Sequence, residues 1–172
     1  DHQAFAKYVQ SVQTVAIGGD DQEIPLEVLG LARQLVPEAI FNTIRLRQAD
    51  PDRLAYYGYT NDSAYGVDSP ALVKRMVAHP QPLPGMSIAA LVVKNGKLKH
   101  VHGVTQLSKH ASDVAAEAGE MIIAPIEVGG RAEAVLDLRT KKGVKFSSQA
   151  TAVAGSISTL LGLQMARARA EK

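Results

Sequence analysis

The spacing of apolar residues predicts helices in five segments of the chain. Apolar positions recur every three or four residues over 4–16, 25–36 and 147–169, which is the spacing that gives a helix one apolar side. Two shorter helices are predicted over 70–78 and 109–118, each preceded by a serine that suits the N-cap position. Prolines and glycines at the ends of these segments set their limits.

Alternation of apolar and polar residues predicts three β-hairpins between the helices. The pairs of strands are 39–48 with 53–59, 87–94 with 97–104, and 121–128 with 132–138. Asn95-Gly96 and Gly129-Gly130 supply two-residue turns of the kind that joins hairpin strands. Six strands in three hairpins favour an α+β fold with one antiparallel sheet over a doubly wound parallel sheet.

The same pattern predicts how the helices cover the sheet. The N-terminal and C-terminal helices carry apolar sides, and we expect them to pack together on one face. The short helices and the loops then cover part of the other face, an arrangement that encloses small-molecule pockets in many proteins. A chain of 172 residues is expected to form a single domain over 1–172.

Composition excludes several classes of function. The chain has no cysteine, which excludes disulfides, thiol catalysis and cysteine-ligated metals. A net charge of +2 and an aromatic content of 5% do not indicate a nucleic-acid partner. No apolar run approaches the ~18 residues of a membrane helix, and no secretory signal is recognisable, so we expect a cytoplasmic protein without membrane contact. Because the chain begins with Asp1, we expect a processed chain or a piece of a longer protein.

No set of catalytic residues is recognisable, so the sequence predicts a protein that is not an enzyme. Without cysteine, nucleophilic catalysis needs Ser or Thr with His and Asp. Ser108 lies near His110, but a helix cap explains Ser108 better, and no G-x-S-x-G motif occurs.

Residues 121–166 resemble the C-terminal half of a GAF domain, and the order of the predicted elements upstream also suits this family. The residues that carry the resemblance are Ala124-Pro125-Ile126-Glu127-Val128-Gly129-Gly130-Arg131, Ala134-Val135-Leu136-Asp137-Leu138, and Phe146-Ser147 before a long helix. The family often has glycine where Ala134 stands. The resemblance implies a sensory or dimerisation module, expected as a homodimer formed through the terminal helices. It also implies an attached output domain, such as a histidine kinase, a transcription activator or a nucleotide cyclase.

Departures from the family's subgroups narrow the choice of cofactor. Cyclic-nucleotide GAF domains carry an Asn-Lys…Phe-x-x-x-Asp-Glu motif, but Thr140 stands for its Asn and Ala150-Thr151 stand for its Asp-Glu. Bilin-attaching GAF domains and GAF-type methionine sulfoxide reductases depend on cysteine, which this chain lacks. Haem-binding GAF domains use histidine, so this option stays open and no cofactor is assigned.

Arg45 and Asp137 are the first candidates for a binding site. Arg45 lies on the polar face of the strand over 39–48, and Asp137 lies on the polar face of the last strand with Arg139. In GAF domains these two strands are neighbours, so the resemblance implies that Arg45 and Asp137 approach each other. Arg45 then either binds a carboxylate or phosphate, or forms an internal ion pair with Asp137.

Tyrosines and histidines supply the other candidates. Four of the five tyrosines, including Tyr57 and Tyr59, fall within ten residues, where they either line a pocket or simply pack in a strand. His100 and His102 share one face of a predicted strand, and His110 follows on the next helix. They are either solvated or ligands of a metal or one haem, although no carboxylate ligand is visible at close spacing.

These observations lead to one function and two alternatives. The sequence predicts a sensor whose small-molecule ligand binds between the sheet and the short helices. The first alternative is a degenerate GAF domain that serves only as a dimerisation module. The second is a haem or metal sensor that acts through His102 or His110.

Overall fold

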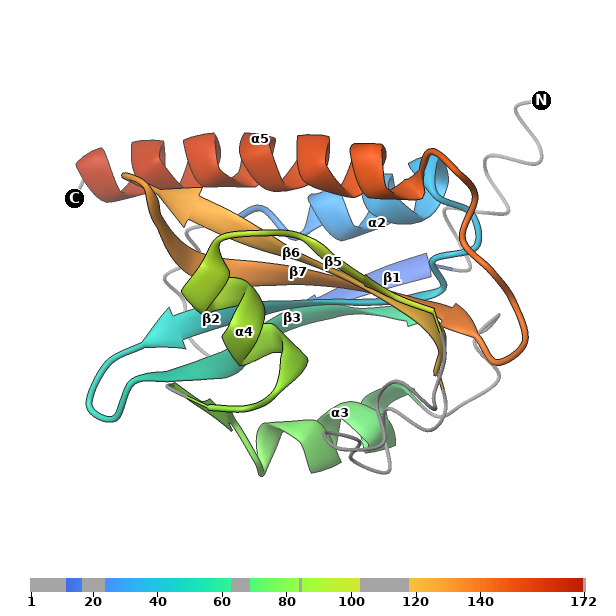
Figure 1. The fold of residues 1–172 in the computed structure, drawn as a ribbon, viewed down its shortest axis with the longest axis horizontal. Coiled ribbons are helices and arrows are strands. Elements are labelled where there is room, and N and C mark those ends of the chain that lie inside the picture. Colours follow the sequence, from blue (N-terminus) through green and yellow to red (C-terminus); the bar gives the residue numbers. More distant parts are fainter. Residues whose placement is uncertain (1–11, 17–23, 63–68, 84, 103–117, 172) are drawn as a thin grey trace.

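The computed structural model describes residues 12–16, 24–62, 69–83, 85–102 and 118–171. This part of the chain forms seven strands and four helices (Figure 1). In chain order these are β1 (Val12–Ala16), α2 (Glu27–Leu35), β2 (Phe41–Gln48), β3 (Arg53–Asp62), α3 (Ser69–Val77), β4 (Gln81–Pro82), α4 (Ile88–Asn95), β5 (Lys99–Val101), β6 (Ala118–Val128), β7 (Arg131–Lys141) and α5 (Ala150–Ala170).

The strands form one antiparallel sheet in the order β1-β3-β2-β7-β6-β5, and β4 pairs with β3. The hairpins β2–β3 and β6–β7 confirm two of the three predicted hairpins. The pairing of β2 with β7 joins them at the centre of the sheet. The α+β class is therefore confirmed, but the described sheet has seven strands and not six.

The segment over 87–94 is a helix, so the predicted strand is wrong. The Ser87 side chain accepts a hydrogen bond from the backbone N–H of Ala90 at 3.1 Å and caps the start of α4. Gly96 has a φ of 65° and ends the helix in the left-handed conformation. Gly96 is thus a helix terminator and not part of a hairpin turn. The strand predicted over 97–104 is reduced to β5 within the described residues.

The chain before α2 also departs from the prediction. Residues 12–16 form β1, which pairs with β3, where the sequence predicted part of a helix over 4–16. Val12 and Val15 are β-branched and suit a strand better than a helix. The segment 4–11 lies outside the described residues. So does the helix predicted over 109–118, except that its last residue begins β6.

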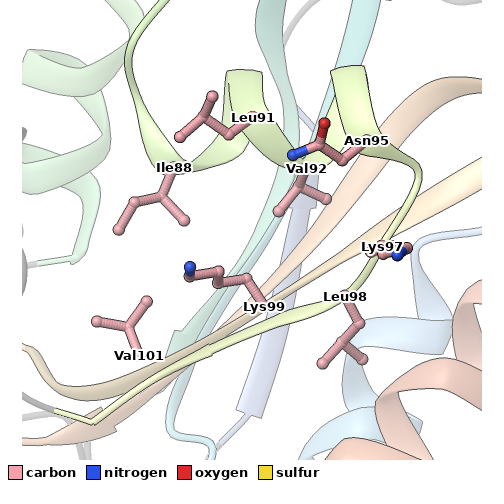
Figure 2. A pocket seen from close by; sticks show the side chains of 8 residues that line it. All are labelled: Ile88, Leu91, Val92, Asn95, Lys97, Leu98, Lys99 and Val101. Atoms are coloured by element: carbon pink, nitrogen blue, oxygen red, sulfur yellow. The ribbon is translucent and has the colours of Figure 1, made fainter.

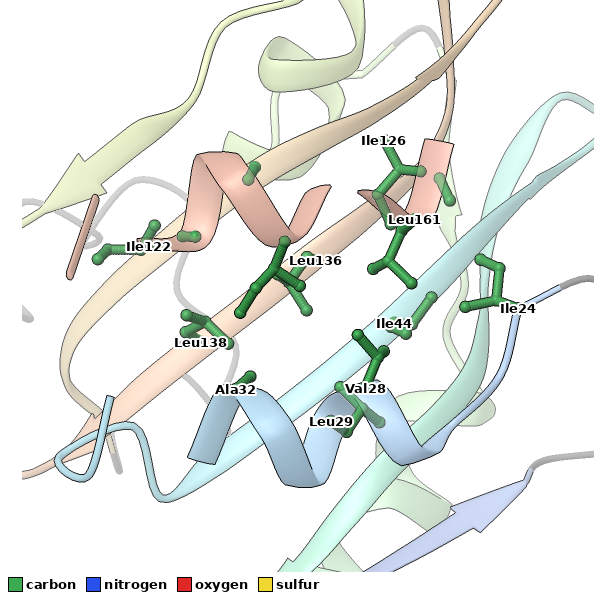
Figure 3. Packing of buried hydrophobic residues seen from close by; sticks show 14 of the residues in the cluster. Ile24, Val28, Leu29, Ala32, Ile44, Ile122, Ile126, Leu136, Leu138 and Leu161 are labelled. Atoms are coloured by element: carbon green, nitrogen blue, oxygen red, sulfur yellow. The ribbon is translucent and has the colours of Figure 1, made fainter. Parts of the chain in front are cut away.

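One face of the sheet is covered by α2 and α5 (Figure 1). Both helices and the sheet contribute to a single apolar cluster, in which Leu29, Leu136 and Leu161 are fully buried (Figure 3). Helices α2 and α5 therefore lie on the same face of the sheet. No helix in the described part of the chain is long and apolar enough to cross a bilayer.

Gly162 sets the distance between α5 and the sheet. A Cβ at this position would lie 2.4 Å from the backbone oxygen of Glu127 in β6, too close for any side chain. At Gly155, two turns earlier in the same helix, a Cβ would meet nothing within 4 Å. At Gly162 the helix therefore comes so close to the β6 backbone that only glycine fits.

The opposite face is covered by α3 and α4, which form two separate apolar clusters. In the first, α3 packs Leu72 and Met76 against Phe41 and Tyr59. In the second, α4 packs its buried residues against the sheet residues Met121, Ile123 and Val135. The sheet residues between the two clusters are polar, and they form the candidate site.

Candidate functional site

The sheet register aligns polar residues on the face that α3 and α4 cover. Thr43 of β2 lies opposite Asp137 of β7, and Arg45 lies opposite Val135, which belongs to the α4 cluster. Paired residues of antiparallel strands point to the same face, as do alternate residues along one strand. Thr43, Arg45, Asp137 and Arg139 therefore project together between α3 and α4.

Two arginines hold the single carboxylate of Asp137. Arg45 Nη2 donates to Asp137 Oδ2 at 2.8 Å. Arg139 donates from Nη2 to Oδ2 at 2.9 Å and from Nε to Oδ1 at 3.1 Å. All three residues are buried, with 3%, 0% and 4% of the surface of Arg45, Asp137 and Arg139 exposed. Within the described residues the two guanidinium groups therefore share one carboxylate.

This arrangement keeps Asp137 ionised. Burial by itself raises the pKa of the Asp137 carboxyl, because the interior solvates a charge poorly. The charges of Arg139 and Arg45 and their hydrogen bonds outweigh burial and hold the pKa of Asp137 below its usual value. The carboxylate is therefore occupied by the two arginines and does not act as a general base.

Arg45 Nε and Thr43 Oγ1 are buried on the same face as Asp137, and neither has a hydrogen-bond partner among the described residues. Leaving a buried polar group unpaired costs about 1–3 kcal/mol, so such atoms mark a position where an acceptor is missing. The Arg45 guanidinium also lies over the Tyr56 ring, 5.4 Å from its centroid, which fixes its plane.

A cavity of about 590 Å³ lies at the edge of the same face, between α4 and β5 (Figure 2). Figure 2 shows the Lys99 side chain between Ile88 of α4 and Val101 of β5. Lys99 pairs in register with Ile123, which pairs with Asp137, so the three residues form one row across the sheet. The cavity and the buried cluster therefore lie along one row, and Arg45 does not line the cavity.

No family model matches the chain, and no curated protein sequence matches it. Solved structures do match it. The GAF domain of an Acinetobacter phosphoenolpyruvate-protein phosphotransferase is similar at 14% identity with a TM-score of 0.62, over 87% of this chain and 83% of that chain. A GAF domain/HD domain protein from Geobacter sulfurreducens is similar at 10% identity with a TM-score of 0.69, over 84% of this chain and 90% of that chain. The fold is that of a GAF domain.

The GAF fold also includes enzymes. The free methionine-R-sulfoxide reductase from Neisseria meningitidis, solved in complex with its substrate, is similar at 14% identity with a TM-score of 0.62, over 85% of this chain and 78% of that chain. The fold is therefore common to regulatory domains and to reductases. The resemblance seen in residues 121–166 is confirmed as a resemblance of fold.

The structure brings together two of the predicted site residues and separates a third. Arg45 and Asp137 are in contact, which the resemblance to GAF domains implied. Tyr59 lies on the same face, buried in the α3 cluster. Tyr57 lies on the opposite face, where its hydroxyl donates to the backbone oxygen of Ile24 and accepts from its N–H, both at 3.1 Å. Tyr57 therefore holds the segment before α2 and is not part of the candidate site.

The predicted histidines are not part of the candidate site either. His100 pairs in register with Ile122, which belongs to the α5 side of the sheet. His102 is exposed beside it at the end of β5, and His110 lies outside the described residues. Thr43 was missed, although it alternates with Arg45 along β2. Only its burial under α3 and α4 distinguishes it from an ordinary strand threonine.

Proposed function

We propose that this chain is a regulatory GAF-type domain that binds a small anionic molecule between the sheet and helices α3 and α4. One observation carries the proposal. Arg45 is buried and shares the carboxylate of Asp137 with Arg139, and its Nε and the neighbouring Thr43 Oγ1 have no hydrogen-bond partner among the described residues. A domain that needs only stability gains nothing from burying such a charge.

The geometry favours a ligand with a carboxylate or phosphate group. Such a group accepts a hydrogen bond from Arg45 Nε and another from the Thr43 hydroxyl, both of which lack a partner among the described residues. The apolar clusters on either side favour a compact apolar remainder. We therefore expect small organic acids to bind better than neutral molecules of the same size.

A regulatory role is favoured over catalysis. The reductases with this fold depend on cysteine in the family as a whole, and the 172 residues contain none. In the described cluster, the carboxylate of Asp137 is held by two cations and is not available to move a proton. Binding without chemistry is the function that these groups support.

The test is a screen of small carboxylates and phosphates by thermal shift, followed by calorimetry. Arg45→Met removes the guanidinium, and Arg131→Met, at an exposed position in the β6–β7 turn, is the matched control. A charge-assisted hydrogen bond contributes about 1.5–3 kcal/mol, so Arg45→Met should weaken binding roughly 10- to 150-fold. Arg131→Met should bind like the original chain. Equal affinity in both variants would contradict the proposed site.

A second candidate function is dimerisation through α5, alone or together with ligand binding. Leu160 and Leu163 are 43% and 66% exposed on this helix, on the side away from the buried Leu161. Exposed leucines on one helix suit a helical interface between two copies. Leu163→Glu should then shift the mass measured by light scattering from dimer to monomer. Val144→Glu, at an exposed loop position before α5, should not. A monomer in all three proteins would contradict this function.

A further inference from the structure

Two histidines and a glutamate meet at the free edge of β5, on the face of the sheet opposite Arg45. Nitrogen atoms of His100 and His102 and a carboxylate oxygen of Glu120 lie within 4.8 Å of one another. His100 Nε2 and Glu120 Oε1 are 2.7 Å apart. The two imidazole rings are in contact, with centroids 3.9 Å apart.

The sheet brings these residues together although they are up to 20 positions apart in the chain. His100 and His102 are alternate residues and point to the same face. Glu120 is in the neighbouring strand β6, at an irregularity in the pairing between Ala118 and Met121. Glu120 precedes Ile122, the register partner of His100, by two residues, so alternation along β6 places its carboxylate on the same face as His100.

We propose that His100, His102 and Glu120 bind one divalent transition-metal ion, and that Zn²⁺ is the ion they suit. Two imidazole nitrogens and one carboxylate oxygen are ordinary zinc ligands, and a fourth position remains for water. Ligand atoms of a tetrahedral zinc site lie about 3.3 Å apart, given bonds of about 2.0–2.1 Å. The three ligand atoms already lie within 4.8 Å of one another, so small side-chain rotations bring them to this spacing.

The surrounding contacts already orient two of the three ligands. Glu120 Oε1 also accepts a hydrogen bond from the backbone N–H of Phe146 at 3.1 Å, and Glu120 is 6% exposed. The Phe146 ring meets the His100 ring edge-on, at 5.5 Å between centroids. Neighbours of this kind fix the direction of metal ligands. A bound ion would link the edge strand β5 to β6 and to the segment that precedes α5.

An ion pair between His100 and Glu120 explains only part of this geometry. It accounts for the 2.7 Å contact, but it does not require a second imidazole, whose centroid lies 3.9 Å from that of the first ring at a tilt of 34°. A metal ion requires both rings. The proposal is independent of the proposed anion site, because His100 pairs with Ile122 on the α5 side of the sheet.

The experiment is a calorimetric titration of the chelator-treated protein with zinc sulfate, with thermal unfolding in parallel. The original chain should bind one Zn²⁺ and unfold at a higher temperature when it is loaded. His102→Ala removes the exposed ligand without disturbing the core and should weaken binding at least tenfold. His79→Ala is the matched control, because His79 is also exposed and follows α3. It should bind Zn²⁺ like the original chain.

Two further measurements separate ligation from a structural role. Glu120→Gln keeps the side-chain length and an acceptor for Phe146 N–H but loses the charge, and it should also weaken binding. Co²⁺ in place of Zn²⁺ should give visible ligand-field absorption in the original chain and none in His102→Ala. The proposal is overturned if the original chain binds no Zn²⁺, or if His102→Ala binds it with unchanged affinity.

Discussion

The two faces of the sheet bury their side chains in different ways. Toward α2 and α5 the sheet contributes to one continuous apolar cluster (Figure 3). Toward α3 and α4 it contributes to two apolar clusters, with Arg45, Asp137 and Arg139 between them. A well-packed apolar replacement for such a buried ion cluster is often neutral or stabilising. The apolar cluster on the first face therefore stabilises the fold. The buried ion cluster on the second face adds little stability, and the proposed binding function explains it better.

The largest effect is expected from Asp137→Asn, which tests the polar face. The substitution leaves Arg45 and Arg139 buried without their shared anion, and breaking a buried ion pair in this way costs about 3–5 kcal/mol. Urea denaturation of both proteins measures the difference in the free energy of unfolding. A cost below about 1 kcal/mol would show that water or another group already neutralises the arginines.

The next effect is expected from Leu161→Ala on the apolar face. Leu161 is fully buried in the α5 cluster, and removing a buried leucine side chain costs about 2–5 kcal/mol. Val144→Ala in the loop before α5 is the control, because its side chain is 40% exposed and should change stability by no more than about 0.5 kcal/mol. Similar losses in both variants would mean that Leu161 is not held in the core. Neither variant should change the affinity for an anionic ligand.

A smaller effect is expected from two glycine substitutions in α5. Gly162→Ala forces the helix away from the Glu127 backbone and should cost about 1–3 kcal/mol, as overpacking usually does. Gly155→Ala meets nothing within 4 Å and should stabilise the protein by about 0.5–1 kcal/mol through helix propensity. Melting temperatures of the two variants should therefore move in opposite directions. If both melting temperatures fell, the new Cβ at position 155 would also be in contact with a neighbouring group.

The smallest effect on the free energy of unfolding is expected from lowering the pH. The folded state lowers the pKa of Asp137, so its contribution to stability is complete above the pKa of an unfolded aspartate, about 3.9. This contribution is lost as the pH falls through the pKa of Asp137 in the folded protein, which lies below the unfolded value. Glu38 and Asp52 have lowered pKa values and act in the same direction. The free energy of unfolding should thus decline below about pH 4, and less steeply in Asp137→Asn than in the original chain. Equal slopes would contradict the ionised Asp137.

The sequence predicted most of the sheet because its central strands have clear alternation and glycine turns. The β6–β7 hairpin and helices α2, α3 and α5 are confirmed close to their predicted limits. The segment of α4 has a continuous apolar run, Ile88 to Val93, whose spacing does not distinguish a helix from a strand. In the structure Ser87 caps the start of this helix and the left-handed Gly96 ends it, whereas the Asn95-Gly96 pair by itself predicts a hairpin turn.

The candidate site was predicted in part. Alternation placed Arg45 and Asp137 on polar faces, and the resemblance to GAF domains supplied the pairing of their strands. Tyr57 was placed wrongly because β2 and β3 are out of regular register there: Ile44 pairs with Gly58 and Arg45 with Tyr56, so Tyr57 is an extra residue. Glu120 was missed because only the pairing of β5 with β6 brings a carboxylate beside His100. The spacing of residues along the sequence does not show which strands pair or where their register shifts.

The close contact at Gly162 limits how α5 can move. A shift by one residue along the axis, with the rotation of about 100° that separates successive helical residues, would bring Leu161 or Leu163 to the Glu127 carbonyl, where the distance of 2.4 Å excludes a Cβ. Such a register shift is therefore blocked in both directions, whereas tilting about the contact keeps glycine in place. The ion pair between Arg169 and Glu133, at 2.9 Å, restrains the far end of the helix. For any motion that α5 transmits, the structure thus favours a tilt about Gly162 over a displacement along the helix axis.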